Sequence, residues 1–72
     1  MAKIIIDEKI RFGKPVIEGT RITVDEVLGA LAGGMTFEEI EYEYGIKKED
    51  ILIALKYATE IISEENVGIV EN

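Results

Sequence analysis

Two helix-start signals, each followed by a glycine stop, constrain the fold of this chain more than any other feature of its sequence. Thr23 and Thr36 each stand three residues before a glutamate, which is the spacing of a capping box. Glycines follow at Gly33-Gly34 and at Gly45, and glycine is the residue that most readily ends a helix in the left-handed conformation. The sequence therefore predicts two short consecutive helices with defined ends.

The apolar residues after these signals recur at helical spacing. A third and longer helix is expected to open at Lys47-Lys48-Glu49-Asp50 and to fray near residues 63–66. The expected core-facing positions are Val24, Val27, Leu28 and Leu31 in the first helix, Phe37, Ile40 and Tyr44 in the second, and Ile51, Ala54, Leu55, Ala58, Ile61 and Ile62 in the third. Residues 23–66 are thus predicted to form a three-helix bundle.

The first 22 residues have a β-type pattern. Ile4–Ile6 and Ile10–Phe12 are expected to be short strands joined by a tight turn, with Val16-Ile17 as a brief extended piece after Pro15. Glu18–Arg21 is expected to be a turn. The prediction is a single domain over residues 1–72, mainly α, with a β-hairpin and loop at 1–22, the bundle at 23–66 and a tail at 67–72.

The composition excludes several kinds of chemistry. The chain has no histidine and no cysteine, so zinc-finger sites, disulfides and Ser-His or Cys-His nucleophile pairs cannot be built. Adjacent carboxylates on a helix, such as Glu38-Glu39, point about 100° apart and do not converge on one ion. We therefore expect no metal, no cofactor and no enzymatic activity.

The net charge of −7 is unevenly distributed. Residues 1–24 carry a net +2, whereas residues 25–72 carry a net −9. The negative net charge argues against general nucleic-acid binding. Because the positive charge is concentrated in residues 1–24, an anionic partner is expected to bind at this basic N-terminal segment.

The chain has no signal-peptide pattern and no membrane-length apolar run, and we expect it to be cytoplasmic.

The second and third predicted helices have the spacing of a helix-turn-helix. A helix over 36–44, a turn at 45–47 and a helix from about 48 fit this motif. Lys47 and Lys48 would then offer two cations to DNA phosphates. Glu49 and Asp50 follow at once, and carboxylates at that place also suit simple stabilisation of the helix dipole. A plain three-helix bundle is the equally good alternative.

The loops around Pro15 carry the other candidate site. Lys14, Thr20 and Arg21 could offer cations and backbone N–H groups to a phosphate or a carboxylate. The segment is not a phosphate-binding P-loop, because the Gly-Lys-Ser/Thr order is missing. The simpler interpretation is turn chemistry, with Arg21 paired with a nearby glutamate.

The chain is also expected to form a homodimer. A domain of this size buries a limited fraction of its surface. The short edge at Ile4–Ile6 invites pairing with a second chain, or with the segment Val67–Val70. A two-fold dimer is the expected arrangement.

Beyond these patterns, Gly13 to Val24 closely resemble the signature Gly-x-Pro-x-Ile-x-Gly-Thr-Arg-Ile-x-Val of a small prokaryotic family, "domain of unknown function 433". The resemblance extends over about residues 4–58. Its downstream positions are Thr36, Glu39 and Ile40, then Glu49-Asp50-Ile51, and then Ala54-Leu55 and Tyr57-Ala58.

This resemblance implies an antitoxin-like protein with a homeodomain-like helix-turn-helix, and a PIN-type nuclease toxin as its partner. One interpretation is a DNA-binding homodimer that reads operator DNA through its third helix, with Arg11, Lys14 and Arg21 on the flanking backbone. The other is a module that does not bind DNA, in which the basic hairpin docks on an acidic nuclease-like partner through Arg21. The chain departs from the family at Lys47, where a threonine or serine is usual, and its turn is one residue shorter.

Overall fold

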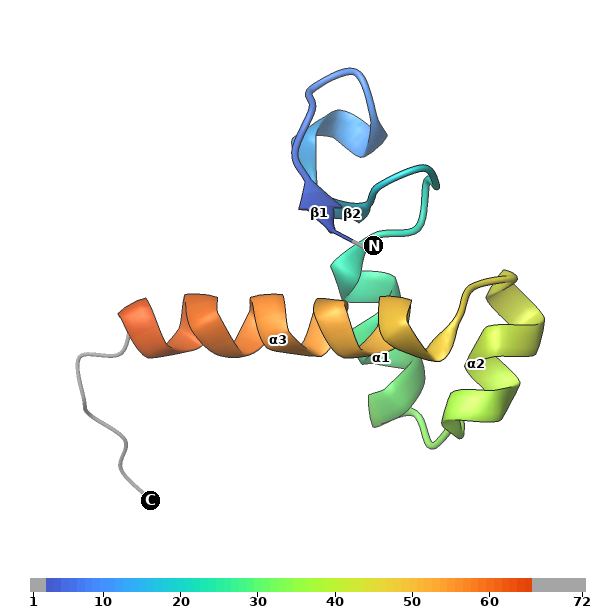
Figure 1. Cartoon of the computed structure of the whole chain (residues 1–72). Coiled ribbons are helices and arrows are strands. Elements are labelled where there is room, and N and C mark those ends of the chain that lie inside the picture. Colours follow the sequence, from blue (N-terminus) through green and yellow to red (C-terminus); the bar gives the residue numbers. More distant parts are fainter. Residues whose placement is uncertain (1–2, 66–72) are drawn as a thin grey trace.

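The computed structural model describes residues 3–65, which form a small N-terminal lobe above three helices (Figure 1). The lobe contains a two-stranded sheet and one 3-10 turn. The elements are β1 (Ile4–Ile5), η1 (Arg11–Gly13), β2 (Val16–Ile17), α1 (Val24–Ala32), α2 (Phe37–Tyr44) and α3 (Lys48–Glu65). The predicted fold class, mainly helical with three helices and a short antiparallel N-terminal hairpin, is confirmed.

Both predicted capping boxes are present. The Thr23 hydroxyl accepts from the N–H of Glu26, and the Glu26 carboxylate accepts from the N–H of Thr23. Thr36 and Glu39 make the same reciprocal pair at the start of α2. The helices also end as predicted, because Gly34 has a φ of 100° and Gly45 a φ of 69°. Local chemistry therefore sets the bounds of α1 and α2.

The strand partner within the hairpin differs from the prediction. β1 pairs antiparallel with β2, with Ile4 opposite Ile17 and Ile5 opposite Val16. The predicted strand at residues 10–12 is wrong, since these residues enter the tight turn η1 instead. Arg11 and Phe12 both have positive φ angles there, which a strand cannot accommodate. Val16 and Ile17 form the inner strand because both side chains are almost fully buried.

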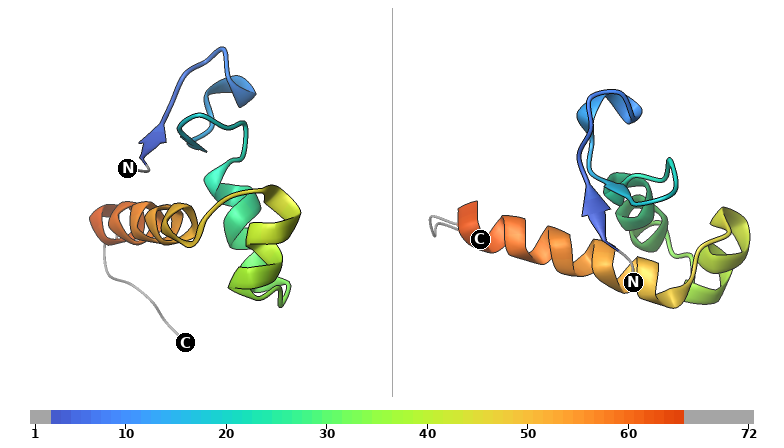
Figure 2. Two further views of the ribbon diagram at one scale, coloured as in Figure 1. Left: turned by 45° about the vertical axis from the view of Figure 1, so that its right-hand side comes forward. Right: turned by 45° about the horizontal axis from the view of Figure 1, so that its top comes forward.

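The hydrophobic core lies where the lobe meets the three helices. Its buried residues are Ile17, Val24, Val27, Ile40, Ile46, Ile51 and Ala54. Most predicted core positions are confirmed as buried or partly buried against this cluster. The exceptions are Ile61, which is partly buried but is not among the residues packed against this cluster, and Ile62, which is 68% exposed. The reason is visible in Figures 1 and 2, where the C-terminal half of α3 extends beyond the other two helices.

None of the helices within residues 3–65 is both long enough and apolar enough to cross a bilayer. The predicted tail at 67–72, including Val67–Val70 as a pairing segment, lies outside the described residues. The single-domain division of the chain stays a prediction.

Candidate functional site

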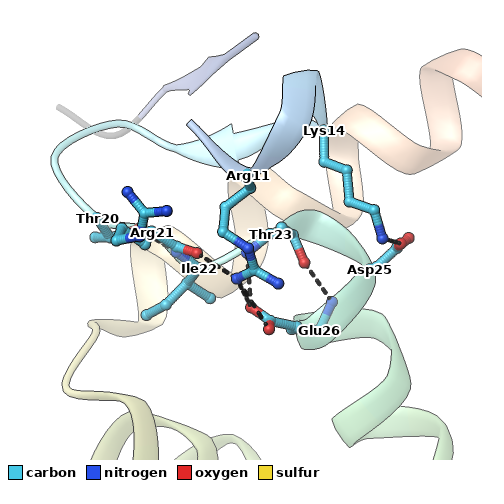
Figure 3. A network of polar contacts seen from close by, with 8 residues as sticks. All are labelled: Arg11, Lys14, Thr20, Arg21, Ile22, Thr23, Asp25 and Glu26. Atoms are coloured by element: carbon cyan, nitrogen blue, oxygen red, sulfur yellow. Dashed lines mark hydrogen bonds and ion pairs between the residues drawn. The ribbon is translucent and has the colours of Figure 1, made fainter. Parts of the chain in front are cut away.

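Arg11 joins three segments of the chain at one point (Figure 3). Its Nη1 donates to the carbonyl oxygen of Arg21 at 2.8 Å and lies 3.2 Å and 3.3 Å from the two carboxylate oxygens of Glu26. The side chains of this ion pair are about one-third and two-fifths exposed. Arg11 therefore connects η1, the turn at Gly19-Thr20-Arg21 (the Gly-Thr-Arg turn) and the first turn of α1.

Glu26 is the acceptor on which this network depends. The hydrogen bond from the Thr23 backbone N–H is the main reason why the pKa of Glu26 lies below its ordinary value. Partial burial opposes this shift, while the hydrogen bond and the positive charge of Arg11 add to it. The carboxylate thus stays ionised, caps α1 and pairs with Arg11 at once.

Lys14 is the second cation of the candidate site that meets a carboxylate of α1. Its Nζ lies 3.5 Å from Asp25 Oδ2, and both side chains are more than half exposed. An exposed pair of this kind is weak, so Lys14 can leave Asp25 for another anion at little cost. Asp25 nevertheless lowers the positive potential that Lys14 offers to a partner.

The Thr20 hydroxyl is used inside its own turn. It donates to the Ile17 carbonyl at 2.8 Å and accepts from the Ile22 N–H at 2.9 Å. The Thr20 N–H also donates to the Ile17 carbonyl. This residue therefore shapes the turn that carries Arg21, and its hydroxyl has no spare donor for a ligand.

Arg21 presents an exposed guanidinium, which points away from Glu26 in Figure 3. The predicted pairing of Arg21 with a nearby glutamate is wrong, because Arg11 occupies Glu26 instead. Among the side chains that the structure describes, no carboxylate lies within ion-pair distance of Arg21. Arg21 lines a shallow surface hollow together with Arg11, Ile22, Glu26 and Tyr44. The geometry leaves Arg21 available for an external carboxylate.

Lys47 and Lys48, the two cations predicted to contact DNA phosphates, are both exposed at the start of α3. The Lys47 N–H donates to the Asp50 carboxylate at 2.9 Å. Asp50 thus caps the helix from its third position, while Lys47 has no side-chain oxygen to complete the reciprocal bond.

The helix next to this pair is strongly acidic. α2 carries four glutamates and no lysine or arginine (Glu38, Glu39, Glu41 and Glu43). It packs against α1 and α3, so its charge lies beside the cations at the α3 N-terminus. A phosphate that approaches the α3 N-terminus would therefore meet the glutamates of α2 as well as the two lysines.

Two features of the site were not predicted from the sequence. The first is the ion pair between Arg11 and Glu26, fifteen residues apart. The second is the exposed ring of Phe12, which stands beside Arg11 in a left-handed backbone conformation. Gly13 and Pro15 are the residues of the sequence that signal a turn there. Over the described residues, no group of three or more potential ligands is placed to hold a metal ion.

Comparison with known proteins identifies relatives of this fold. A protein of Mycobacterium tuberculosis (strain ATCC 25618 / H37Rv), described as "Putative antitoxin VapB45", is 33% identical over 54 residues, which are 75% of this chain and 23% of that protein. The crystal structure of Rv2018 from Mycobacterium tuberculosis matches with a TM-score of 0.66 and 33% identity, over 72% of this chain and 24% of that chain. This chain therefore spans about a quarter of the length of these relatives.

The family signature is matched over most of the chain. Residues 4–58 fit the family described as "Protein of unknown function (DUF433)". These residues include the hairpin, the turn at Gly19-Thr20-Arg21, α1, α2 and α3 as far as Ala58. The resemblance that the signature from Gly13 to Val24 predicts is confirmed: this chain belongs to the DUF433 family.

Proposed function

We propose that this chain is an antitoxin-like protein that acts by binding an acidic protein partner through the Arg21 side of its N-terminal lobe. The relative described as an antitoxin supports the general role. The observation that supports this surface is the Arg21 guanidinium, which is exposed and has no ion-pair partner among the described side chains.

The chemistry of Arg21 suits a carboxylate-rich partner. A guanidinium binds a carboxylate through two parallel hydrogen bonds. A metal-dependent nuclease holds its metal ions with carboxylates in its active site. Ile22 and Tyr44 beside Arg21 supply apolar surface that excludes water from such a contact. A PIN-type nuclease toxin is the partner that we propose, and a cytoplasmic location follows from this proposal.

Co-purification with the protein encoded beside this chain's gene tests the proposal. We expect Arg21→Ala to reduce the amount of co-purified partner strongly, and Arg21→Lys to restore only part of it. The matched control is Lys9→Ala, which removes another exposed cation of the same lobe and should have little effect. Equal co-purification by the wild type and Arg21→Ala would exclude Arg21 as the contact.

DNA binding by a homodimer is the second candidate function. The exposed Lys47 and Lys48 at the α3 N-terminus support it, because that end of the helix enters the major groove in a helix-turn-helix protein. The four carboxylates of α2 oppose it, since the helix before the recognition helix crosses the DNA backbone in that motif. The acidic α2 is the reason why we place protein binding first.

Fluorescence anisotropy with the chain's own promoter DNA tests this second candidate. We expect binding at low salt that weakens steeply as salt is added, and a weaker complex for Lys48→Glu. The control is Lys9→Glu, which makes the same charge change away from α3. No binding at low salt would remove this function, and a light-scattering mass near 8.0 kDa at micromolar concentration would contradict the homodimer.

A further inference from the structure

The turn η1 carries an aromatic ring that the fold exposes in a strained backbone conformation. Phe12 has φ 58° and ψ 34°, and Arg11 before it has φ 52°. Left-handed angles are unfavourable for a residue that has a Cβ, and strain of this kind is concentrated at functional sites. The Phe12 ring is 95% exposed, so packing within the described part of the chain does not offset the strain. The ring is therefore available for a contact outside these residues.

Hydrogen bonds hold this turn in place around the ring. The N–H groups of Gly13 and Lys14 each donate to the carbonyl three residues earlier. The Arg11 side chain is held by Glu26 and by the Arg21 carbonyl. A ring that is presented on a fixed turn loses little backbone entropy when it is bound, which is the property of an anchor residue at a protein interface.

The charges around the ring are close to balanced. Residues 7–14 carry two carboxylates and three cations. Two of these cations already face carboxylates of α1, because Arg11 lies 3.2 Å from Glu26 and the Lys14 ammonium lies 3.5 Å from Asp25. A partner can therefore cover Phe12 without leaving an uncompensated charge in the contact. The ring suits an apolar pocket, and recognition of an anion is left to the unpaired guanidinium nearby.

That guanidinium belongs to Arg21, which is joined to the Phe12 turn by Arg11. Figure 3 shows the Arg11 side chain reaching from η1, and its Nη1 donates to the Arg21 carbonyl at 2.8 Å. The backbones that carry the ring and the free guanidinium are thus no farther apart than one arginine side chain spans. A protein contact of standard size buries about 800 Å² of each partner, which is enough to include both residues.

We propose that Phe12 is the apolar anchor of the contact that Arg21 makes with the acidic partner, and that this partner has an apolar pocket beside its carboxylates. The inference rests on the proposed protein-binding function, and it adds a second contact residue and a feature of the partner. A second copy of this chain suits the surface less well. A two-fold contact through it would place an unpaired Arg21 on each side, where a carboxylate is needed.

A calorimetric titration with the purified protein encoded beside this chain's gene tests the inference. We expect Phe12→Ala to weaken the complex at least about 30-fold, as loss of an interface hot spot does, and Phe12→Leu to recover part of that loss. The matched control is Tyr42→Ala, which removes a ring that is 88% exposed on α2 and should change the affinity by less than about 2-fold. Circular dichroism checks that each variant stays folded.

The salt dependence of binding separates the ring from the guanidinium. Phe12→Ala should weaken the complex by the same factor at low and at high salt, because the ring carries no charge. Arg21→Ala should cause a larger loss at low salt than at high salt, because salt screens charge pairs. A loss in Phe12→Ala that disappears at high salt would show that the ring acts through the charges of its turn, and would contradict the anchor role.

The remaining outcomes distinguish this inference from the proposed function. Equal affinities of Phe12→Ala and the wild type, with Arg21→Ala still weakened, would overturn this inference alone. A wild type that does not bind the neighbouring protein would overturn the proposed function together with it. Light scattering of the chain by itself tests the other occupant. A mass that falls from twice 8.0 kDa in the wild type to 8.0 kDa in Phe12→Ala would assign the ring to a second copy and overturn the inference.

Discussion

The guanidinium of Arg11 lies 3.2 Å from the carboxylate of Glu26, although the two residues are fifteen positions apart in the sequence. This ion pair ties the turn that carries Phe12 to the N-terminus of α1. The same Arg11 nitrogen donates to the carbonyl of Arg21, so this side chain also holds the turn that carries Arg21.

Arg11→Ala should destabilise the protein by about 1–2 kcal/mol, because it removes a charged hydrogen-bond network at a partly exposed site. Urea unfolding at neutral pH measures this change. Lys14→Ala, which breaks the more exposed pair with Asp25, should cost less than about 0.5 kcal/mol. Equal effects of the two variants would contradict the structural role of Arg11.

The stability that Glu26 contributes should depend on pH. Its pKa is lowered in the folded state, mainly by the Thr23 N–H, so its ionised form stabilises the fold above the unfolded pKa of about 4.3. That contribution is lost as the pH falls through the lower folded pKa. Glutamine can still cap the helix, so Glu26→Gln should be less stable than the wild type at pH 7 and nearly equal to it at pH 2. Urea unfolding at both pH values checks this, and a constant difference would contradict it.

Phe12→Gly should stabilise the monomer or leave it unchanged, within about 1 kcal/mol. Glycine removes the strain of the left-handed conformation, while the exposed ring contributes no burial. Unfolding is followed at protein concentrations low enough to exclude dimers. A loss of more than about 1 kcal/mol would show that the ring packs within its own chain.

Thr20→Val should cost about 1–2 kcal/mol, because it removes the hydroxyl that bridges the Ile17 carbonyl and the Ile22 N–H. Thr59→Val is the control, since the Thr59 hydroxyl only donates back to the Leu55 carbonyl on an exposed helix face. Chemical denaturation of both variants measures the difference. If Thr20→Val were neutral, the turn would not need its threonine.

Two glycines should respond in opposite ways to alanine. Gly45 ends α2 with φ 69°, so Gly45→Ala should destabilise by about 1 kcal/mol even though the added Cβ meets open space. Gly29 lies inside α1 and also faces open space, so Gly29→Ala should stabilise by about 0.5–1 kcal/mol. Thermal unfolding of both variants distinguishes backbone strain from packing.

The sequence by itself determined the parts of this protein that depend on neighbouring residues. The capping boxes at Thr23 and Thr36 and the stop at Gly45 need only contacts within a few residues, and all three are present in the structure. The family signature from Gly13 to Val24 likewise occupies one continuous stretch. The family that it indicates is confirmed by a match over residues 4–58.

Only the tertiary structure decided the contacts between distant residues. Ile4 and Ile5 pair with β2 rather than with the nearer residues 10–12. The reason is that the side chains of Val16 and Ile17 in β2 are buried, so β2 is the segment that the fold holds in extended form next to β1. Arg11 rather than Arg21 occupies Glu26 for the same kind of reason, since charge and local pattern are alike for the two arginines. The fold places Arg11 against α1 and leaves Arg21 in solvent. This placement decides which arginine stabilises the fold and which one is available to a partner.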